Sequence, residues 1–355
     1  MAVFEIGYRP NLINCGLGGV LNHSRWLAAL AVSSAHLRIL LFPDYAGGGW
    51  LTKLFYFVTL FGTQAVVVFF VASGLLVGGS IIRAIMQERF DQIVYAIDRG
   101  SRLYIVLIPA VFMTEAFRLF GLSTTCPQPQ RLSQLFGNLM FLQNFGFSPL
   151  CNNHPLWSLS SEAFFYLIGP PLLITCISRD WRAAAMAAVL VCCAAYFWEP
   201  NYQTPLFGLI LWLAGLAPWF IRIRLNPWLG ILPFAAVLLL SRGHLAFNEF
   251  TDSLALAATF AFFLSCDFKA ATVPLNRLGI YFAGFSYSLY LIHMPVSQAF
   301  ASELQRPLSA SSLRSYGIYC SALLLILLGA WAFGVMFEDR TKALRNQLMR
   351  LRGHF

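Results

Sequence analysis

Apolar runs separated by short polar segments follow one another along almost the whole chain. A helix needs about 20 mainly apolar residues to cross a bilayer. Stretches that approach or exceed this length lie at 25–43, 54–82, 103–120, 157–177, 183–199, 205–221, 227–242, 252–268, 279–302 and 313–337. The pattern predicts an all-α fold, a polytopic membrane helical bundle of about ten transmembrane helices.

Segment 132–147 is apolar but is interrupted by Gly137, Asn138 and Asn144. We interpret it as a surface or re-entrant helix, with an eleventh span as the alternative. With ten spans and a cytoplasmic N-terminus, 17 of the 24 Lys and Arg residues fall on the inner side. An eleventh span would invert every later loop and spoil this bias, so we place both termini in the cytoplasm.

Composition agrees with a lipid environment. Hydrophobic residues make up 58% of the chain and charged residues 11%, with a mean hydropathy of +0.67, whereas soluble proteins carry about 25% charged residues. A net charge of +9 on a soluble protein would suggest nucleic acid. Here the basic residues lie in short loops, where they set membrane orientation. We expect no nucleic-acid partner, and in the absence of a P-loop or zinc-type cysteine pairs we expect no metal.

The chain divides into a cytoplasmic N-terminal segment (1–24), a membrane domain (25–337) and a basic cytoplasmic tail (338–355), which we expect to be a solvated or headgroup-bound helix. Cysteines within apolar runs are expected to be buried: Cys176, Cys192, Cys193, Cys266 and Cys320. Cys126 and Cys151 share the outer 121–156 segment. They are either free or joined by a disulfide, because sequence does not supply the geometry.

Ionisable residues inside spanning helices are costly and usually face a cavity. Arg25 and His36 lie eleven residues apart, about three helical turns, so both point to one face roughly 16 Å apart along the axis, with Arg25 at the inner rim. Histidine can take a proton from a hydroxyl near neutral pH. The alternative is a structural histidine bonded to another helix, with Arg25 as a snorkelling anchor.

Arg99 and Arg102 stand at the start of the third apolar stretch, with an i, i+3 spacing that favours one face. Two guanidiniums beside the free N–H groups of a helix N-terminus suit a phosphate. Asp98 could brace Arg102 one turn away. The alternative is ordinary positive charge on the inner side.

Glu162 lies four residues after Ser158 and is expected to share its face. It could orient a histidine or bind a sugar hydroxyl, or the two could simply cap the helix. His293 lies deep in an apolar helix and is a site candidate by position, with hydrogen-bonded packing as the alternative. Glu115 and Arg118 are expected to form an ion pair.

Five segments, in order, resemble the motifs of the acyltransferase-three family of integral-membrane O-acyltransferases, and the likeness runs from about Arg25 to Phe337. They are Arg25 with His36, the Phe-Phe-x-x-Ser-Gly pattern in 66–76, Arg-x-x-Arg at 99–102, Trp-Ser-Leu-x-x-Glu in 156–162, and Ser-Tyr-x-x-Tyr-Leu-x-His in 285–293. Small residues of the second motif also predict close helix packing. Ala163 departs from the family, which often has a second acidic residue there.

The resemblance implies an enzyme of the bacterial inner membrane that moves an acyl group, acetyl by default, from acyl-CoA (acetyl-CoA) to a carbohydrate hydroxyl. The acceptor would be a surface polysaccharide, a lipid-linked glycan or a glycoside. The resemblance also implies that Arg25, Arg99 and Arg102 bind the coenzyme A phosphates. His36 would be general base or covalent acyl carrier, and Glu162 and His293 would orient the acceptor or tune His36.

Two other functions fit the buried charges less well. A transporter or flippase for a lipid-linked glycan would use them to bind substrate or protons, but transporters often show internal repeats and none is evident. A purely structural membrane subunit would need no histidines at the midplane.

Overall fold

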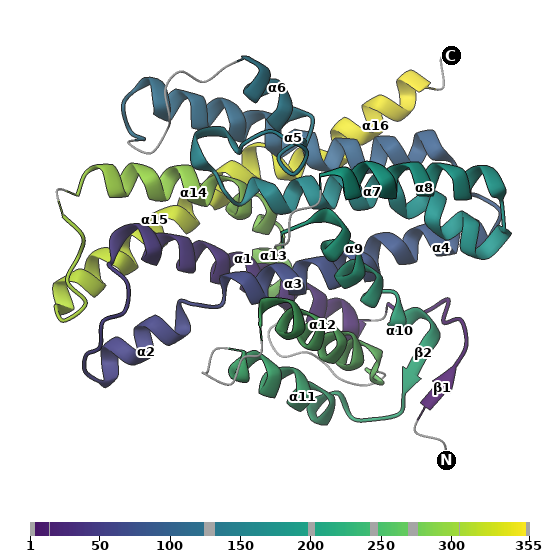
Figure 1. Ribbon diagram of the computed structural model, residues 1–355, viewed down its shortest axis with the longest axis horizontal. Coiled ribbons are helices and arrows are strands. Elements are labelled where there is room, and N and C mark those ends of the chain that lie inside the picture. Colours follow the sequence, from purple (N-terminus) through teal and green to yellow (C-terminus); the bar gives the residue numbers. More distant parts are fainter. Residues whose placement is uncertain are drawn as a thin grey trace.

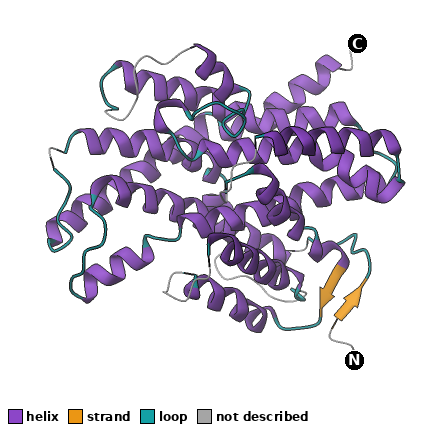
Figure 2. Ribbon diagram, viewed as in Figure 1, coloured by secondary structure: helices purple, strands orange, loops and turns teal. Residues whose placement is uncertain are grey.

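The computed structural model describes residues 4–13, 15–123, 132–197, 203–241, 248–268, 276–304 and 306–352. Helices make up almost all of it (Figures 1 and 2), which confirms the all-α prediction. A small antiparallel sheet is the exception, and pairs β1 (Phe4–Ile6) with β2 (Ile221–Ile223). Both chain ends lie on the right in Figure 1.

Helices form over every one of the predicted apolar stretches. Their bounds are α1 (Cys15–Leu41), α2 (Trp50–Val58), α3 (Gly62–Ser73), the π-helical η1 (Gly74–Gly78), α4 (Gly79–Met86), α5 (Gln92–Leu119), α7 (Leu156–Ser178), α8 (Trp181–Tyr196), α9 (Pro205–Ala214), α10 (Ala217–Phe220), α11 (Pro227–Leu240), α12 (Glu249–Ser265), α13 (Asn276–Ala283), α14 (Ser286–Ser302) and α15 (Leu313–Met336). The 3₁₀ turns η2 (Leu150–Asn152) and η3 (Glu338–Arg340), with α6 (Leu132–Leu139) and α16 (Thr341–Arg352), complete the set for the described residues.

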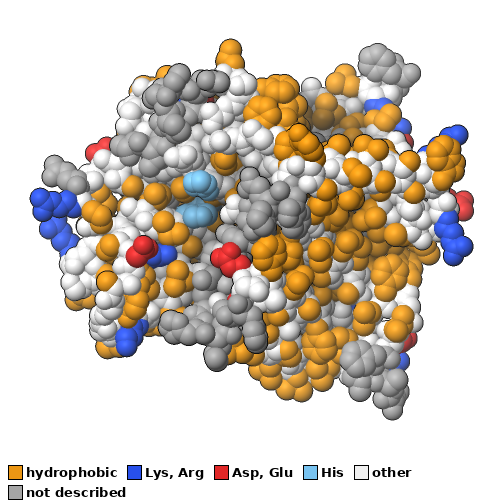
Figure 3. Space-filling model, in the orientation of Figure 1, with side chains coloured by type: hydrophobic (Ala, Val, Ile, Leu, Met, Phe, Trp, Pro, Cys, Tyr) orange, Lys and Arg blue, Asp and Glu red, His pale blue; other side chains and the backbone are white. Residues whose placement is uncertain are grey.

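Three helical stretches of the described chain are long and apolar enough to cross a membrane: Trp50–Met86, Leu156–Ser178 and Leu313–Arg352. Shorter apolar helices lie at Trp181–Tyr196, Pro205–Phe220 and Pro227–Leu240. Figure 3 shows hydrophobic side chains over much of one face, with Lys and Arg towards its left and right ends. Such a surface is suited to lipid rather than to water.

Segment 132–147 does not form a continuous helix. Helix α6 covers eight residues, about 12 Å of rise, far less than a bilayer core. The chain then turns through Phe141, whose φ is 58°. The segment is therefore a short helix followed by a turn, and an eleventh span at this place is wrong.

Two helices begin well before their predicted starts. Helix α1 begins at Cys15 and α5 at Gln92, so Arg25 and Arg102 each lie ten residues inside a helix, about 15 Å from its start. The predicted place of Arg102 at the start of its helix is therefore wrong. The first N–H groups of α5 are capped by the Asp91 side chain, which accepts from Ile93 and Val94 at 2.9 and 3.0 Å, so they are not open to a phosphate.

Helix packing is closest where the chain is richest in small residues. A Cβ added to Gly74 would lie 1.8 Å from the carbonyl oxygen of Trp212, and one added to Gly215 would lie 2.1 Å from that of Val71. The π-helical turn that begins at Gly74 leaves a backbone carbonyl without its usual α-helical partner. The indole of Trp219 donates to the carbonyl of Leu75 at 2.8 Å. The predicted close packing by small residues is confirmed.

The C-terminal tail docks on the bundle instead of standing free. Arg345 of α16 pairs with Asp98 of α5, and Arg352 pairs with Asp91 at 2.6 Å. The partners are seven residues apart on each helix, which fits two helices that run antiparallel. Hydrogen bonds from Val94 and Arg352 hold the pKa of Asp91 below its usual value, so this carboxylate stays charged at neutral pH. Asp98 therefore binds the tail. The prediction that it braces Arg102 is wrong.

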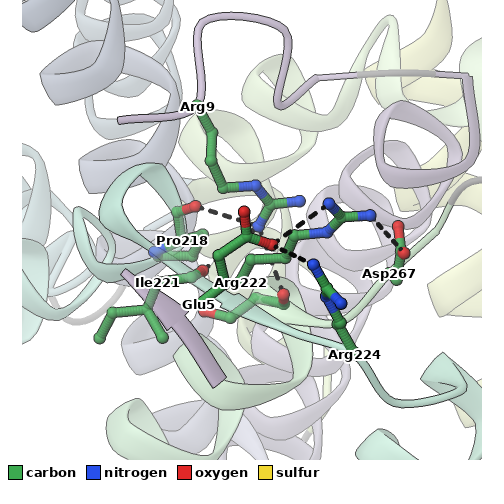
Figure 4. A network of polar contacts seen from close by, with 8 residues as sticks. Glu5, Arg9, Pro218, Ile221, Arg222, Arg224 and Asp267 are labelled. Atoms are coloured by element: carbon green, nitrogen blue, oxygen red, sulfur yellow. Dashed lines mark hydrogen bonds and ion pairs between the residues drawn. The ribbon is translucent and has the colours of Figure 1, made fainter. Parts of the chain in front are cut away.

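A second polar network ties the N-terminus to β2. The Arg9 guanidinium donates to the carbonyls of Pro218 and Ile221, both at 3.2 Å (Figure 4). Arg222 pairs with Asp267 at 2.7 Å, and Arg224 with Glu5 at 3.0 Å. The network joins the N-terminal segment, β2 and the segment after α12.

The predictions for the Glu115–Arg118 pair and for the cysteines are partly confirmed. Glu115 and Arg118 form the predicted ion pair at 2.7 Å. Only Cys266 of the five cysteines in apolar runs is buried; Cys176, Cys192, Cys193 and Cys320 are exposed, because apolar helices expose much of their surface to lipid. Cys151 is disulfide-bonded, and Cys126 lies outside the described residues.

Replacing Gly74 by Ala is expected to lower the free energy of unfolding by about 1–3 kcal/mol, because the added methyl meets a backbone carbonyl that cannot move away. The matched control is Gly329→Ala in α15, where an added Cβ meets nothing within 4 Å. Thermal unfolding of both variants in the same detergent checks this. Equal melting temperatures would contradict the packing described here.

Candidate active site

One cavity in the middle of the bundle collects a residue from each of the five sequence motifs. Its lining includes Arg25 of α1, Ser73 of α3, Arg102 of α5, Glu162 of α7 and Tyr287 of α14. These residues come from helices far apart in the sequence, and α1 packs against both α3 and α14. The cavity is small, about 80 Å³, enough for a few water molecules or a small organic group.

Glu162 is held by hydroxyl groups. Its Oε1 accepts from the Tyr166 hydroxyl at 2.5 Å and from Ser73 Oγ at 3.4 Å. Ser158 lines the same cavity, so the predicted shared face is confirmed. Ser158 does not cap the helix: its hydroxyl donates to the carbonyl of Pro155. Glu162 contacts neither predicted histidine among the described residues.

Tyr166 owes its position to a proline one turn further along. Pro170 has no N–H to donate, so the carbonyl four residues earlier, that of Tyr166, lacks its helical partner. The Tyr95 hydroxyl donates to this carbonyl at 3.1 Å, which joins α5 to α7 behind the cavity. The sequence analysis did not single out Tyr95 or Tyr166, although the proline was a visible signal.

Arg25 and Arg102 face the cavity without a direct partner. Neither guanidinium forms a hydrogen bond or an ion pair with any described residue. Their charges are offset at longer range by Glu162 and Glu338, which act on both arginines through space. Balanced charges reduce the cost of burial, while the N–H donors stay available for a ligand.

Glu338 is a second carboxylate that the sequence analysis missed. It was counted as part of the basic tail, yet its Oε2 accepts from the backbone N–H and the hydroxyl of Ser288 at 2.9 and 2.8 Å. It therefore caps α14 near the helix start, where a negative charge is stabilised. No local pattern pointed to this contact, because 50 residues separate the partners.

Arg99 opens onto a different cavity from Arg102. It lines a larger space between α5 and α7, and its guanidinium lies 5.7 Å from the ring centre of Tyr166. Tyr166 lines both cavities. The two arginines of the predicted fork thus line different cavities that share Tyr166.

The two predicted histidines meet directly. His36 Nδ1 lies 2.9 Å from His293 Nε2, and the rings stack with centres 5.2 Å apart. His293 is fully buried, whereas His36 is partly exposed. Sequence had pointed to each residue separately, and the pair is the result of packing α1 against α14.

The backbone fixes which nitrogen of each ring carries the proton. His293 Nδ1 lies 3.1 Å from the carbonyl oxygen of Leu289, and a carbonyl can only accept, so Nδ1 is the protonated nitrogen. The Nε2 of neutral His293 then accepts, and His36 Nδ1 donates to it. This leaves His36 Nε2 with a free lone pair, and no described residue occupies it. Such a nitrogen is suited to take a proton from a substrate.

A second proline holds His293 in place. Pro295 deprives the carbonyl of Leu291 of its helical partner, and Asn153 donates to that carbonyl at 3.4 Å. Tyr290, one turn before the histidine, has its ring centre 5.9 Å from that of His293 and also lines the central cavity. Its hydroxyl bonds to Ser158. Tyr290 is therefore the wall between the cavity and the histidine pair.

A polar pocket lies on the other side of the site. It encloses about 560 Å³ and is lined by His154, Trp157, Phe197 and amide side chains that include Gln143 and Asn144. Gln143 Oε1 is buried without a hydrogen-bond partner. His154 is near enough to His36 for electrostatic interaction. Within the described residues no three His, Cys, Asp or Glu side chains cluster as a metal site.

The structure is that of a membrane-associated helical protein in which two imidazoles, His36 and His293, are oriented by hydrogen bonds. Residues 20–335 match a family model described as an acyltransferase domain, and the chain belongs to this acyltransferase-three family. The family membership that the resemblance implied is therefore confirmed.

One curated relative is similar over part of the chain. Acyltransferase MdmB of Streptomyces mycarofaciens is 30% identical over 179 residues, which cover 47% of this chain and 43% of that protein. The match thus spans less than half the length of the relative. No solved structure matches the chain.

Replacing Glu338 by Ala is expected to lower the free energy of unfolding by about 1–2 kcal/mol, because α14 loses its cap. Asp339→Ala is the matched control, since Asp339 is exposed and adjacent. Thermal unfolding of the two variants under the same conditions tests the difference. If both variants melt together, the capping role is refuted.

Proposed function

We propose that this enzyme is an integral-membrane O-acyltransferase that moves an acyl group, acetyl in the simplest case, from acyl-CoA to a carbohydrate hydroxyl. The observation that supports it most is the free Nε2 of His36, oriented by His293. The proposal includes about ten membrane spans, cytoplasmic termini and a place in the bacterial inner membrane.

The central cavity would receive the donor from the cytoplasmic side. Arg25 and Arg102 offer N–H groups that have no partner among the described residues, and guanidinium groups bind phosphate strongly. The cavity is too small for a whole coenzyme A, so only the narrow pantetheine arm would pass beyond the arginines, towards Tyr290. Arg99 faces another cavity, so this donor site rests on Arg25 and Arg102.

The chemistry follows from the order of the imidazoles. His36 Nε2 takes the proton of the acceptor hydroxyl, and the oxygen attacks the thioester carbonyl. The C–S bond then breaks, and the imidazolium returns the proton to the leaving thiolate. His293 Nε2 accepts from His36 Nδ1 throughout, so it stabilises the imidazolium in the way that a carboxylate does in a serine hydrolase triad.

The polar pocket is suited to the acceptor. Sugars present hydroxyl groups and apolar ring faces, and the pocket offers amide side chains together with the rings of Trp157 and Phe197. His154 in its wall lies near His36. A carbohydrate placed there would bring a hydroxyl towards the reactive nitrogen, and the ordered protein groups would hold it.

His36→Ala is expected to lower acyl transfer at least about 100-fold, because the proton acceptor is lost. The assay supplies labelled acetyl-CoA and candidate glycans to purified protein in detergent. His23→Ala is the control, since His23 lies on the same helix and accepts from Trp26. A protein that never labels any glycan but moves one across a bilayer would instead be a transporter.

Arg102→Gln is expected to weaken acetyl-CoA binding at least about tenfold, since a charged hydrogen bond to the donor is lost. Glycan binding should change little. Isothermal titration measures both affinities, with exposed Arg182→Gln as the charge-matched control. An unchanged donor affinity in Arg102→Gln would refute this part of the proposal.

A further inference from the structure

The cavity that holds Arg99 differs in character from the site described above. It encloses about 620 Å³ between α5, α7, α8 and the turn after α6. Aromatic and aliphatic side chains make up most of the wall, and among the described residues that line it only Arg99 is charged. Tyr166 alone is shared with the central cavity, so the two spaces touch at one ring.

Most of the exposed side chains in the wall of this cavity are apolar, and Gln92 is a polar exception. Leu167, Met186 and Met140 belong to the wall and are 65%, 48% and 43% exposed. Leu167 lies on α7, which is long and apolar enough to span a membrane. Such side chains face lipid in a membrane protein, so a molecule that enters here comes from the bilayer.

Arg99 is a cation without a counterion. Its Nη2 donates to Ser80 at 3.2 Å, but its Nε is buried with no partner. No described carboxylate lies within ion-pair distance, and the guanidinium stacks against Tyr95 and Tyr166. An unpaired charge in an apolar, lipid-facing cavity is costly, so the site is complete only with an anion.

We propose that this cavity binds one anionic phospholipid, with the phosphate on Arg99 and an acyl chain along the aromatic wall. A single guanidinium complements a single phosphate charge, and the remaining wall complements hydrocarbon. Acyl-CoA does not fit this description, because its several phosphates and its adenine require a polar lining. A free phosphate ion would leave the apolar volume unfilled.

The bound lipid would also affect the central cavity that holds Glu162. A phosphate on Arg99 lies against Tyr166, whose hydroxyl holds Glu162 at 2.5 Å. A bound lipid therefore fixes the tyrosine that separates the two cavities. This consequence for catalysis rests on the proposed function, whereas lipid binding does not depend on it.

Native mass spectrometry of the purified protein in detergent tests the site. Phosphatidylglycerol is compared with diacylglycerol of the same chains, which lacks the phosphate. The wild type should bind one phosphatidylglycerol with at least about tenfold preference, and Arg99→Gln should lose that preference, because a hydrogen bond to a charged group is removed. Gly100→Leu should weaken both lipids, since Gly100 lines the cavity and an added Cβ there meets open space.

The controls match each change. Arg182→Gln removes an exposed charge, and Gly317→Leu adds the same side chain at an exposed open position in α15; both should bind lipid as the wild type does. Acetyl-CoA affinity, measured on the same samples, separates this site from the donor site: Arg99→Gln should keep it, and Arg102→Gln should lose it while keeping the lipid.

Three results would overturn the proposal. The first is an Arg99→Gln variant that keeps its preference for phosphatidylglycerol. The second is loss of acetyl-CoA affinity in Arg99→Gln, which would return Arg99 to the donor site. The third is displacement of phosphatidylglycerol by inorganic phosphate or, at much lower concentration, by a polyprenyl phosphate, because either would identify a different occupant.

Discussion

The hydrogen bond between His36 Nδ1 and His293 Nε2 is the contact on which the site depends. The Leu289 carbonyl sets the direction of this bond, because it fixes the proton on the far side of His293. A backbone carbonyl thereby determines, through two rings, which nitrogen of His36 is free. In water an imidazole exchanges tautomers without preference for a partner. Inside a membrane protein unsatisfied polar atoms are costly, so each ring is held in a single tautomer.

The same constraint explains how the helices are joined. Proline residues in α7 and α14 free the carbonyls of Tyr166 and Leu291, and side chains of Tyr95 and Asn153 satisfy them. The π-helical turn in the second motif frees the Leu75 carbonyl for Trp219. Each interruption of a regular helix thus becomes a specific bond to another segment. Apolar packing alone would hold such helices together less specifically.

Around the central cavity, opposite charges offset one another at longer range instead of forming close ion pairs. Two arginines and two glutamates act on one another through space, yet no guanidinium there touches a carboxylate. Direct pairs occur instead at the bundle end, where Asp98 and Asp91 anchor the tail. Close ion pairs are therefore used to fasten segments, and the separated charges stay available for a ligand. Arg99 differs from both groups, because it lines a cavity whose wall holds no carboxylate among the described residues.

The sequence by itself determined the helices and most of the chemical groups. Apolar runs of membrane length predict helices because the backbone must satisfy its own hydrogen bonds in lipid, and rare ionisable residues in such runs mark a site. His36, Arg25, Glu162 and His293 were all found in this way. The helix starts were misplaced at Arg25 and Arg102, because polar first turns continue a helix that the apolar pattern does not reveal.

Only the tertiary structure decided which groups face one another. Helices that are apolar all round carry little sign of which face meets a neighbour, so an i, i+3 spacing could not show that Arg99 and Arg102 line different cavities. The cap of α14 by Glu338 and the pairing of His36 with His293 join residues 50 and 257 positions apart. Contacts of that range depend on the packing of the whole bundle, and no local pattern encodes them.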